Sequence, residues 1–453
     1  MNTEAISTSE AGVEGEPLAA AVPGSTVIRE QVSRAPLINR MLLLFMVAMV
    51  LANTGGHMYQ ALLPLYLKDL NASVVQVGLF FTLSQIVPLA LQILGGWISD
   101  SLGRLRSIAL GSLAGTLSYV GLVLAPTWQW VLLGEGFASV TRSLVGPSFS
   151  AFIAEQSTEE NRARVFGITE TIFMVVAVVG PPLGGWLADN YGFKFMLMCA
   201  GGLYFLAMLI RIGMARVAAR SSEANPEKLS FSGLKANLGM MLGMLLAGGL
   251  VTWILVTDGV RDIAFAMSFN LMPLYLQDIG GLSIQQIGWM ESVFGVFMML
   301  ITVPAGWLAD KRSERLAIVM GFVLQFLALL TFLRVSSFIG YMAAWALLGL
   351  GVGMMSPAYQ SLISKAVPEK LRGTAFGLFS TSLGVVSLPA PAIGAQLWER
   401  VSPRFPFSIT AWLGLLAVLP VWLKFKLPAK DEPTVLFGGA LDRYPRSGES
   451  TTG

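Results

Sequence analysis

The feature that most constrains this chain is a short polar turn between two apolar runs, which returns about 210 residues later. The first copy reads G-G-W-I-S-D-S-L-G-R-L-R over residues 95–106, and the second reads A-G-W-L-A-D-K-R-S-E-R over residues 305–315. Five further pairs keep this separation: Pro147 and Pro357, Arg162 and Arg372, Gly167 and Gly377, Pro181 and Pro391, and Gly184 and Gly394. A duplication this long, covering several apolar runs, predicts a membrane protein built from two parallel copies of one unit.

The composition agrees with a chain that crosses a membrane many times. Its mean hydropathy is +0.67 and 13% of its residues are charged, against roughly a quarter in soluble domains. A single cysteine, Cys199, excludes a disulfide framework, and a single histidine, His57, excludes a histidine-clustered metal site. We therefore expect no metal and no cofactor. The net charge of +3 comes from loops rather than from one basic patch, so no nucleic-acid partner is expected.

Apolar runs of about 20 residues, the length that crosses a bilayer, occur twelve times. They lie near 41–66, 74–98, 107–125, 129–154, 164–187, 193–215, 250–276, 283–309, 316–334, 339–364, 374–397 and 406–426. We predict an all-α membrane protein with 12 transmembrane helices in two parallel six-helix repeats. Most lysines and arginines fall in the loops on the side of Arg104, which predicts that this side and both termini are cytoplasmic, in the inner or plasma membrane.

The polar segments divide the chain into five parts. Residues 1–37 and 428–453 are expected to be disordered cytoplasmic tails, and neither shows the pattern of a signal peptide. A cytoplasmic linker over 216–249 separates an N-terminal six-helix bundle, 38–215, from a C-terminal one, 250–427. The apolar piece 236–250 has two interpretations, an amphipathic helix on the inner surface, which the repeat register favours, or the true start of the seventh span.

The repeated turn resembles the signature loop of the major facilitator superfamily, G-x-x-x-D-[RK]-x-G-[RK]-[RK]. The first copy matches at four positions: Gly96, Asp100, Gly103 and Arg104. The second copy matches at three: Gly306, Asp310 and Lys311. The departures are Ser101 and Leu105 in the first copy and Ser313 and Glu314 in the second.

This resemblance implies a monomeric transporter of a small molecule whose two halves rock about a central cavity. It implies that the two loops act as conformational latches. Asp100 is expected to face the positive end of a helix near Gly373, and Arg104 to reach Glu155. The alternative is topological: the cations keep the loop on the inner side and Asp100 is simply solvated.

Ionisable residues inside apolar spans are costly, by about 2.5–3.5 kcal/mol each on insertion scales, so each is a candidate for proton coupling or for the substrate cavity. The candidates are His57, Glu135, Arg142, Glu170, Asp258, Arg261, Asp262 and Glu291. Asn53, one turn before His57, and the nearby Gln60 add a polar face to the first span. A structural role, such as packing or mutual neutralisation, is the alternative for every one of them.

For two groups of these residues the sequence suggests a specific role. Arg142 and Gly146 resemble the R-x-x-x-G motif in the fourth span of proton-coupled facilitators, where the arginine biases protonation of a nearby acid; a structural pair with Glu135 is the alternative. Asp258, Arg261 and Asp262 lie at i, i+3 and i+4 and so share one helix face. If the seventh span begins earlier, this second group becomes a solvated turn.

The fifth span favours export over import. Its end resembles the G-P-x-x-G-G part of the motif of facilitator antiporters: Gly180, Pro181, Gly184 and Gly185. We therefore expect a secondary transporter that exports a hydrophobic or amphipathic small molecule in exchange for protons. Two alternatives stay open: a proton-coupled importer of a sugar or an organic acid, which Gln85, Tyr359 and Gln360 would suit, and a non-transporting receptor or scaffold. An enzyme is not expected, because no catalytic set occurs at a recognisable spacing.

Overall fold

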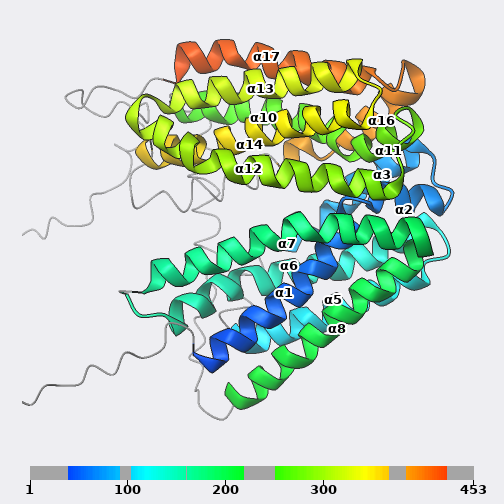
Figure 1. Cartoon of the computed structure of the whole chain (residues 1–453), viewed down its shortest axis with the longest axis vertical. Coiled ribbons are helices and arrows are strands. Elements are labelled where there is room, and N and C mark those ends of the chain that lie inside the picture. Colours follow the sequence, from blue (N-terminus) through cyan, green and yellow to red (C-terminus); the bar gives the residue numbers. More distant parts are fainter. Residues whose placement is uncertain (1–38, 92–103, 160, 219–249, 367–383, 426–453) are drawn as a thin grey trace, which may run out of the picture. The chain divides into compact units, whose positions relative to one another are not determined.

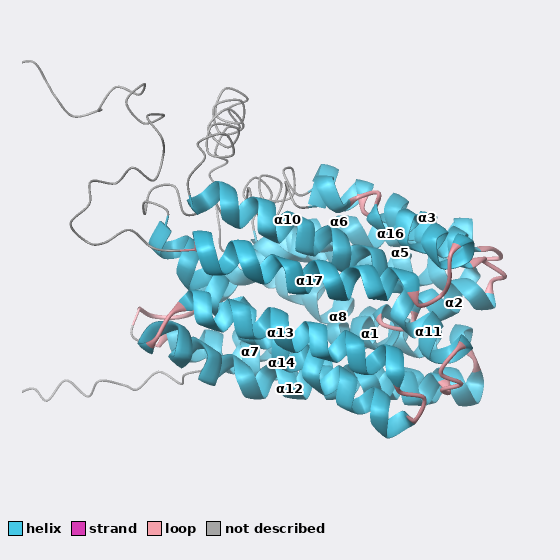
Figure 2. Cartoon of the chain, turned by 90° about the horizontal axis from the view of Figure 1, so that it is seen from above, coloured by secondary structure: helices cyan, strands magenta, loops and turns pink. Residues whose placement is uncertain are grey.

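The computed structural model describes residues 39–91, 104–159, 161–218, 250–366 and 384–425, and in these residues the regular structure is helical (Figure 2). The first half contains α1 (Arg40–Gln60), α2 (Leu63–Asp69), α3 (Val74–Ser84), α5 (Arg104–Leu124), α6 (Trp128–Gln156), α7 (Arg162–Tyr191) and α8 (Phe193–Ala218). The second contains α10 (Leu250–Ser268), η1 (Phe269–Leu271), α11 (Met272–Asp278), α12 (Ile284–Lys311), α13 (Glu314–Arg334), α14 (Phe338–Ala366), α16 (Ala390–Arg400) and α17 (Phe405–Lys424).

These elements form twelve consecutive helical passes, as the apolar runs predict. Within the described ranges, nine helices are long and apolar enough to cross a bilayer. The other passes are α6, the charged α10 and the short α16. The first pass is divided into α1 and α2, and the seventh into α10, η1 and α11. The last piece of each begins next to a proline, Pro64 or Pro273. A proline is tolerated there because the first turn of a helix does not need its N–H.

Two helix starts repeat the same capping geometry. The Ser73 side chain accepts the backbone N–H of Gln76, whose own side chain accepts the N–H of Ser73. Ser283 and Gln286 form the same reciprocal pair in the second half. Such a capping box satisfies two N–H groups that the helix itself leaves without partners. The duplication seen in the sequence therefore extends to the local hydrogen bonds.

Each half packs as its own bundle within the compact unit Leu37–Gly453. In the first half, α5 packs along α6 and α8, and α1 along α7 and α8; in the second, α14 packs along α12 and α13, and α17 along α13 and α10 (Figure 1). The most extensive contacts between the halves are made by α7 with α12 and by α3 with α16. These two seams decide how the halves meet.

Glycines at equivalent positions permit these close approaches. A Cβ added to Gly184 would lie 1.9 Å from the Met58 carbonyl oxygen, and one added to Gly394 would lie 1.9 Å from the Met267 carbonyl oxygen. Across the halves, a Cβ on Gly78 would lie 2.6 Å from the Pro391 oxygen and one on Gly288 would lie 2.5 Å from the Pro181 oxygen. Because both seams use matching residues, the two repeats are related by a pseudo-twofold arrangement of contacts.

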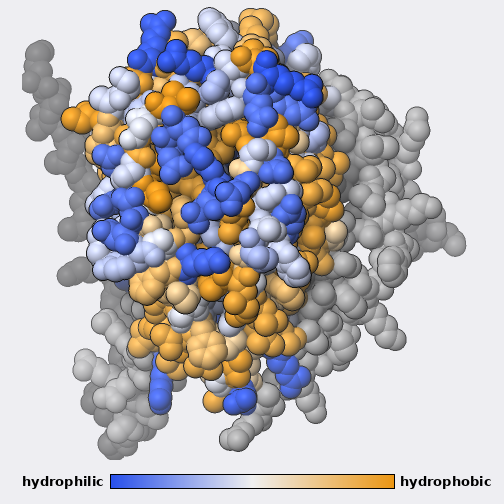
Figure 3. All heavy atoms as spheres, turned by 90° about the vertical axis from the view of Figure 1, so that its right-hand side faces the viewer, coloured by the Kyte–Doolittle hydropathy of each residue, from blue (hydrophilic) through white to orange (hydrophobic). Residues whose placement is uncertain are grey.

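The outside of the bundle is apolar along the helices. Large hydrophobic side chains such as Leu124, Val303 and Ile339 are 71%, 78% and 77% exposed. Figure 3 shows the end of the molecule where the connections after α2 and α11 lie, and hydrophilic residues gather on it. An apolar belt with a polar end is the surface of a protein that spans a bilayer.

Candidate functional site

Two cavities lie at equivalent places in the two halves. The first, of about 400 Å³, is lined by α1, α5, α6, α7 and α8. The second, of about 460 Å³, is lined by α10, α12, α13 and α14. Asn53 in the first cavity matches Asp262 in the second, one repeat further along the chain, and Arg142 matches Val352. The first, third and fourth passes of each half, α1, α5 and α6 or α10, α13 and α14, therefore line a cavity in both halves, with different chemistry.

The polar centre of the first half joins α1 to α6. Glu135, which is 7% exposed, accepts a hydrogen bond from the Tyr59 hydroxyl at 3.2 Å. Its other oxygen lies 3.4 Å from an Arg142 nitrogen, which also donates to the Ser139 hydroxyl at 3.1 Å. Tyr59 and Arg142 line the cavity and Glu135 lies behind them. The carboxylate is thus shared between a hydroxyl of one helix and a guanidinium of another.

Of the other candidate residues in the first half, some line the cavity and one lies in the packing between helices. Asn53, Gln60 and Glu170 line the cavity. His57 is not among its lining residues; its ring packs edge-on against Phe173 at 5.6 Å between centroids, and its backbone and Cβ meet Gly180. His57 therefore lies in the packing between α1 and α7.

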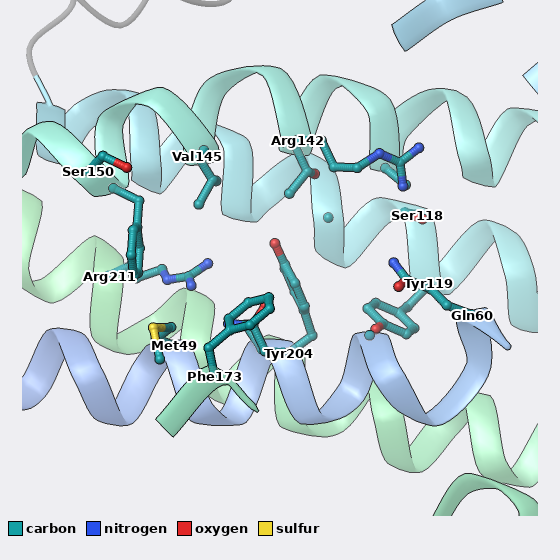
Figure 4. Close-up of a pocket in the computed structure, with 18 of the residues that line it drawn as sticks. Met49, Gln60, Ser118, Tyr119, Arg142, Val145, Ser150, Phe173, Tyr204 and Arg211 are labelled. Carbon is teal, nitrogen blue, oxygen red and sulfur yellow. The ribbon is translucent and has the colours of Figure 1, made fainter. Parts of the chain in front are cut away.

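Arg211 and the tyrosines beside it are not among the site residues predicted from the sequence. Arg211, on α8, is 3% exposed and lines the first cavity. Tyr204 and Tyr119 line it too, with ring centroids 5.4 Å apart. Figure 4 shows Arg211 and Tyr204 directed toward each other across from Arg142 and Ser150. The charge of Arg211 inside an apolar run was the available signal.

The second cavity carries the predicted acidic cluster on α10. One Arg261 nitrogen lies 2.8 Å from Asp258 and 2.8 Å from Asp262. The guanidinium carbon also lies 5.3 Å from the centre of the Tyr359 ring. The three charged residues share one helix face, as their spacing predicts, and they line the cavity together with Gln325 and Gln360. Two carboxylates beside one guanidinium leave one negative charge in excess.

Glu291 lies outside both cavities. It lies on α12 of the second bundle, next to Ser292, whose hydroxyl donates to the Val178 carbonyl of α7.

The latch loops are described in part. Gly96, Asp100 and Gly103 lie outside the described residues, as does Gly373. The Arg104 Nε donates to Glu155 at 3.3 Å, which is the contact expected for it. In the second copy, Gly306, Asp310 and Lys311 lie in the last turns of α12, where the Asp310 and Lys311 side chains are exposed. The next helix begins with Glu314, which binds Lys365 and accepts a hydrogen bond from the Ser361 hydroxyl at 3.0 Å.

The antiporter-like segment of α7 forms contacts in two directions. Gly180 and Gly184 face α1, while a Cβ on Gly185 would lie 2.9 Å from the Ile284 oxygen of α12. Pro181 presents its carbonyl to Gly288, also on α12. This segment is therefore at once part of the first bundle and of the seam between the halves.

Polar contacts also cross between the halves. Lys68 binds Asp278, and its amine donates to the Gln277 side chain at 3.4 Å. The Ala392 N–H donates to the Thr82 hydroxyl at 3.2 Å. The Val75 N–H donates to Glu399 at 3.3 Å, and the Ser292 hydroxyl donates to the Val178 carbonyl. These contacts involve the parts of the helices nearest the connections after α2 and α11.

Comparison with known proteins agrees with this architecture. The sequence profile described as Major Facilitator Superfamily matches residues 43–233 and 255–446. The chain is 26% identical to the multi-drug resistance efflux pump PmrA homolog of Lactococcus lactis, over 80% of this chain and 89% of that protein. It is 23% identical to the multidrug resistance protein MdtG of Klebsiella pneumoniae, over 82% and 89%.

Among solved structures, the fold is similar to that of the nucleoside transporter NupG, with a TM-score of 0.71 at 12% identity over 86% of this chain and 100% of that one. It is also similar to a bacterial homologue of the iron transporter ferroportin in an inward-facing state, with a TM-score of 0.69 at 16% identity over 86% and 99%. With the duplicated bundles, the two seams and a family match across both halves, the chain belongs to the major facilitator superfamily and is a membrane transporter rather than an enzyme.

Proposed function

We propose that this transporter exports hydrophobic or amphipathic small molecules in exchange for protons, by alternating access. The observation that carries the proposal is the Glu135 carboxylate, buried at the wall of the first cavity and shared by Tyr59 and Arg142. The relatives named as multidrug efflux proteins and the glycine-rich segment of α7 support export.

The chemistry follows from the environment of the acid. A guanidinium beside a carboxylate stabilises its ionised form, whereas burial without a cation favours the protonated acid. Movement of Arg142 away from Glu135 would therefore favour proton uptake, and its return would favour release. Asp258 and Asp262 provide a second place where a proton or a cationic group could offset excess negative charge.

The proposal includes an orientation and a layout. The loops on the Arg104 side carry most of the basic residues, so we place that side and both termini in the cytoplasm of a cell whose inner or plasma membrane holds the protein as a monomer. The bundles then span about 38–215 and 250–427. The tails and most of the linker lie outside the described residues. The Lys68–Asp278 ion pair and the hydrogen bond from the Val75 N–H to Glu399 would close the outer side, so the conformation would be inward-facing.

The test uses purified protein in liposomes with a more acidic interior, offered a set of lipophilic dyes and drugs outside. An exchanger should drive their uptake as protons leave, and collapse of the gradient by an ionophore should abolish the effect. Absence of gradient dependence for every compound would contradict the proposal.

One observation favours a second function, import together with protons. Gln325, Tyr359 and Gln360 line the second cavity, and amides and hydroxyls of this kind bind sugars and organic acids. In the same liposomes, uptake of such a nutrient driven by an acidic exterior would favour this function over export.

A further inference from the structure

Arg211 is a buried charge to which the proposed mechanism assigns no role. It comes from the run Leu209–Ile212 on α8, and its side chain is 3% exposed although it lines the first cavity. A buried ion normally has a counter-charge, because removal from water without one is costly.

The partners of Arg211 are neutral. One terminal nitrogen donates to the Ser112 hydroxyl at 2.9 Å, and the guanidinium carbon lies over the Tyr204 ring, 6.0 Å from its centre. The Nε atom is buried and has no hydrogen-bond acceptor. In the described part of the chain Arg211 makes no ion pair, whereas Arg142 is paired with Glu135 and Arg261 with Asp258.

A purely structural role accounts for part of this arrangement. The Ser112 hydroxyl accepts from Arg211 and donates to the Ile108 carbonyl, so the arginine ties α8 to α5. However, a guanidinium has five N–H donors in one plane, and a tie of this kind needs neither the charge nor the Nε donor. The charge, which no carboxylate among the described residues offsets, therefore remains to attract an anionic group in the cavity that Arg211 lines.

We infer that Arg211 forms an anion subsite, which binds the carboxylate or another planar or tetrahedral anionic group of an otherwise apolar ligand. Guanidinium groups bind such anions through paired, charge-assisted hydrogen bonds. The walls around it supply apolar contact from Met49, Phe149 and Phe173. Glu170 is the acidic residue among those lining this cavity, and it forms no ion pair with Arg211.

This inference rests on the proposed function in one respect, that the first cavity holds the transported molecule. It narrows the substrate class to molecules that combine an apolar body with one negative group.

The test is equilibrium binding to the purified protein in detergent, with naphthalene-2-carboxylate and the neutral naphthalene-2-carboxamide as probes. The wild type should bind the carboxylate at least about tenfold more tightly than the amide. The two probes have nearly the same shape, and only the carboxylate carries a charge that Arg211 can bind. Arg211→Gln should remove this preference and leave amide affinity unchanged. Arg211→Lys should retain part of it, because the charge remains without the planar donor pair.

Arg315→Gln is the matched control. Arg315 also lies over an aromatic ring, 4.3 Å from the Trp422 centroid, and donates to a neutral oxygen, but it lines neither cavity. Its variant should keep the carboxylate preference.

The inference is overturned if the wild type binds the carboxylate no better than the amide, or if Arg211→Gln keeps the preference. If Arg211→Gln does not fold, Arg211→Lys decides: a preference for the carboxylate that is kept in full or in part supports the subsite, and loss of the whole preference overturns it. Binding needs no proton gradient, so loss of the subsite and loss of proton-driven export are separate results.

Discussion

Glu135 is a candidate acid for which each carboxylate oxygen has a partner. Tyr59 on α1 and Arg142 on α6 bind its two oxygens, so any rearrangement of these helices changes the partners of one buried carboxylate. Ser139, one turn from both residues on α6, contributes a neutral hydroxyl to the same arginine. The charge of Glu135 and the neutral contact between Ser139 and Arg142 can therefore be tested by separate substitutions.

Glu135→Gln should lower gradient-driven uptake at least about tenfold, because glutamine still accepts a hydrogen bond from Tyr59 but offers no charge to Arg142. Exchange of labelled substrate without a gradient should persist, since it needs no proton. Ser139→Ala is the control and should keep most of the gradient response. A Glu135→Gln protein with wild-type response would show that this acid carries no coupled proton.

Spacing along the chain was enough to predict the residue contacts that lie on one helix. Glu135 and Arg142 are two turns apart, and Asp258, Arg261 and Asp262 fall within one turn, and both sets are in contact. The same reasoning grouped His57 with Asn53, yet Asn53 lines the cavity and His57 packs against Phe173. Arg211 was not selected, because its significance depends on the neutral partners that α5 brings to it.

At the scale of elements, α7 is closely packed on two sides. Its glycines approach α1 on one side and α12 on the other, so the helix has little room to accept a side chain at these positions. Gly167, nearer the start of the same helix, has open space around the place where a Cβ would be. Substitutions at a tightly packed glycine and at an unpacked one can therefore be compared within the same helix.

Gly184→Ala should reduce the yield and thermal stability of the folded protein, because the new methyl group would overlap the Met58 backbone, which can yield only by separating α1 from α7. Gly167→Ala should leave both unchanged or slightly raise stability, since alanine favours a helix. Thermal unfolding in detergent, followed by tryptophan fluorescence, measures the difference. Equal unfolding temperatures for the two variants would contradict the packing argument.

At the scale of the whole molecule, the two bundles meet at seams near the connections after α2 and α11. Lys68 and Asp278 form an ion pair between the halves there, and Gln277, which occupies the position of Lys68 in the repeat, is the second partner of that amine. Alternating access requires such contacts to break and re-form in each cycle.

A reversible cross-link between Lys68→Cys and Asp278→Cys, made with a short bifunctional thiol reagent in a Cys199→Ala background, should abolish transport. The link would hold the halves together at this end, and reduction should restore activity. Each single cysteine variant treated with the same reagent is the control and should stay active. Full transport by the cross-linked protein would exclude separation of the halves at this end.

The amino-acid sequence alone determined the number of passes, the duplication and the charged groups on a single helix, because each follows from residue type and spacing along one chain. The tertiary structure decided which faces of the helices line the two cavities, which glycines touch a neighbouring backbone, and that Arg211 is buried among neutral partners. Those properties depend on how separate helices are rotated against one another, and rotation is set by packing between segments that are distant in the sequence.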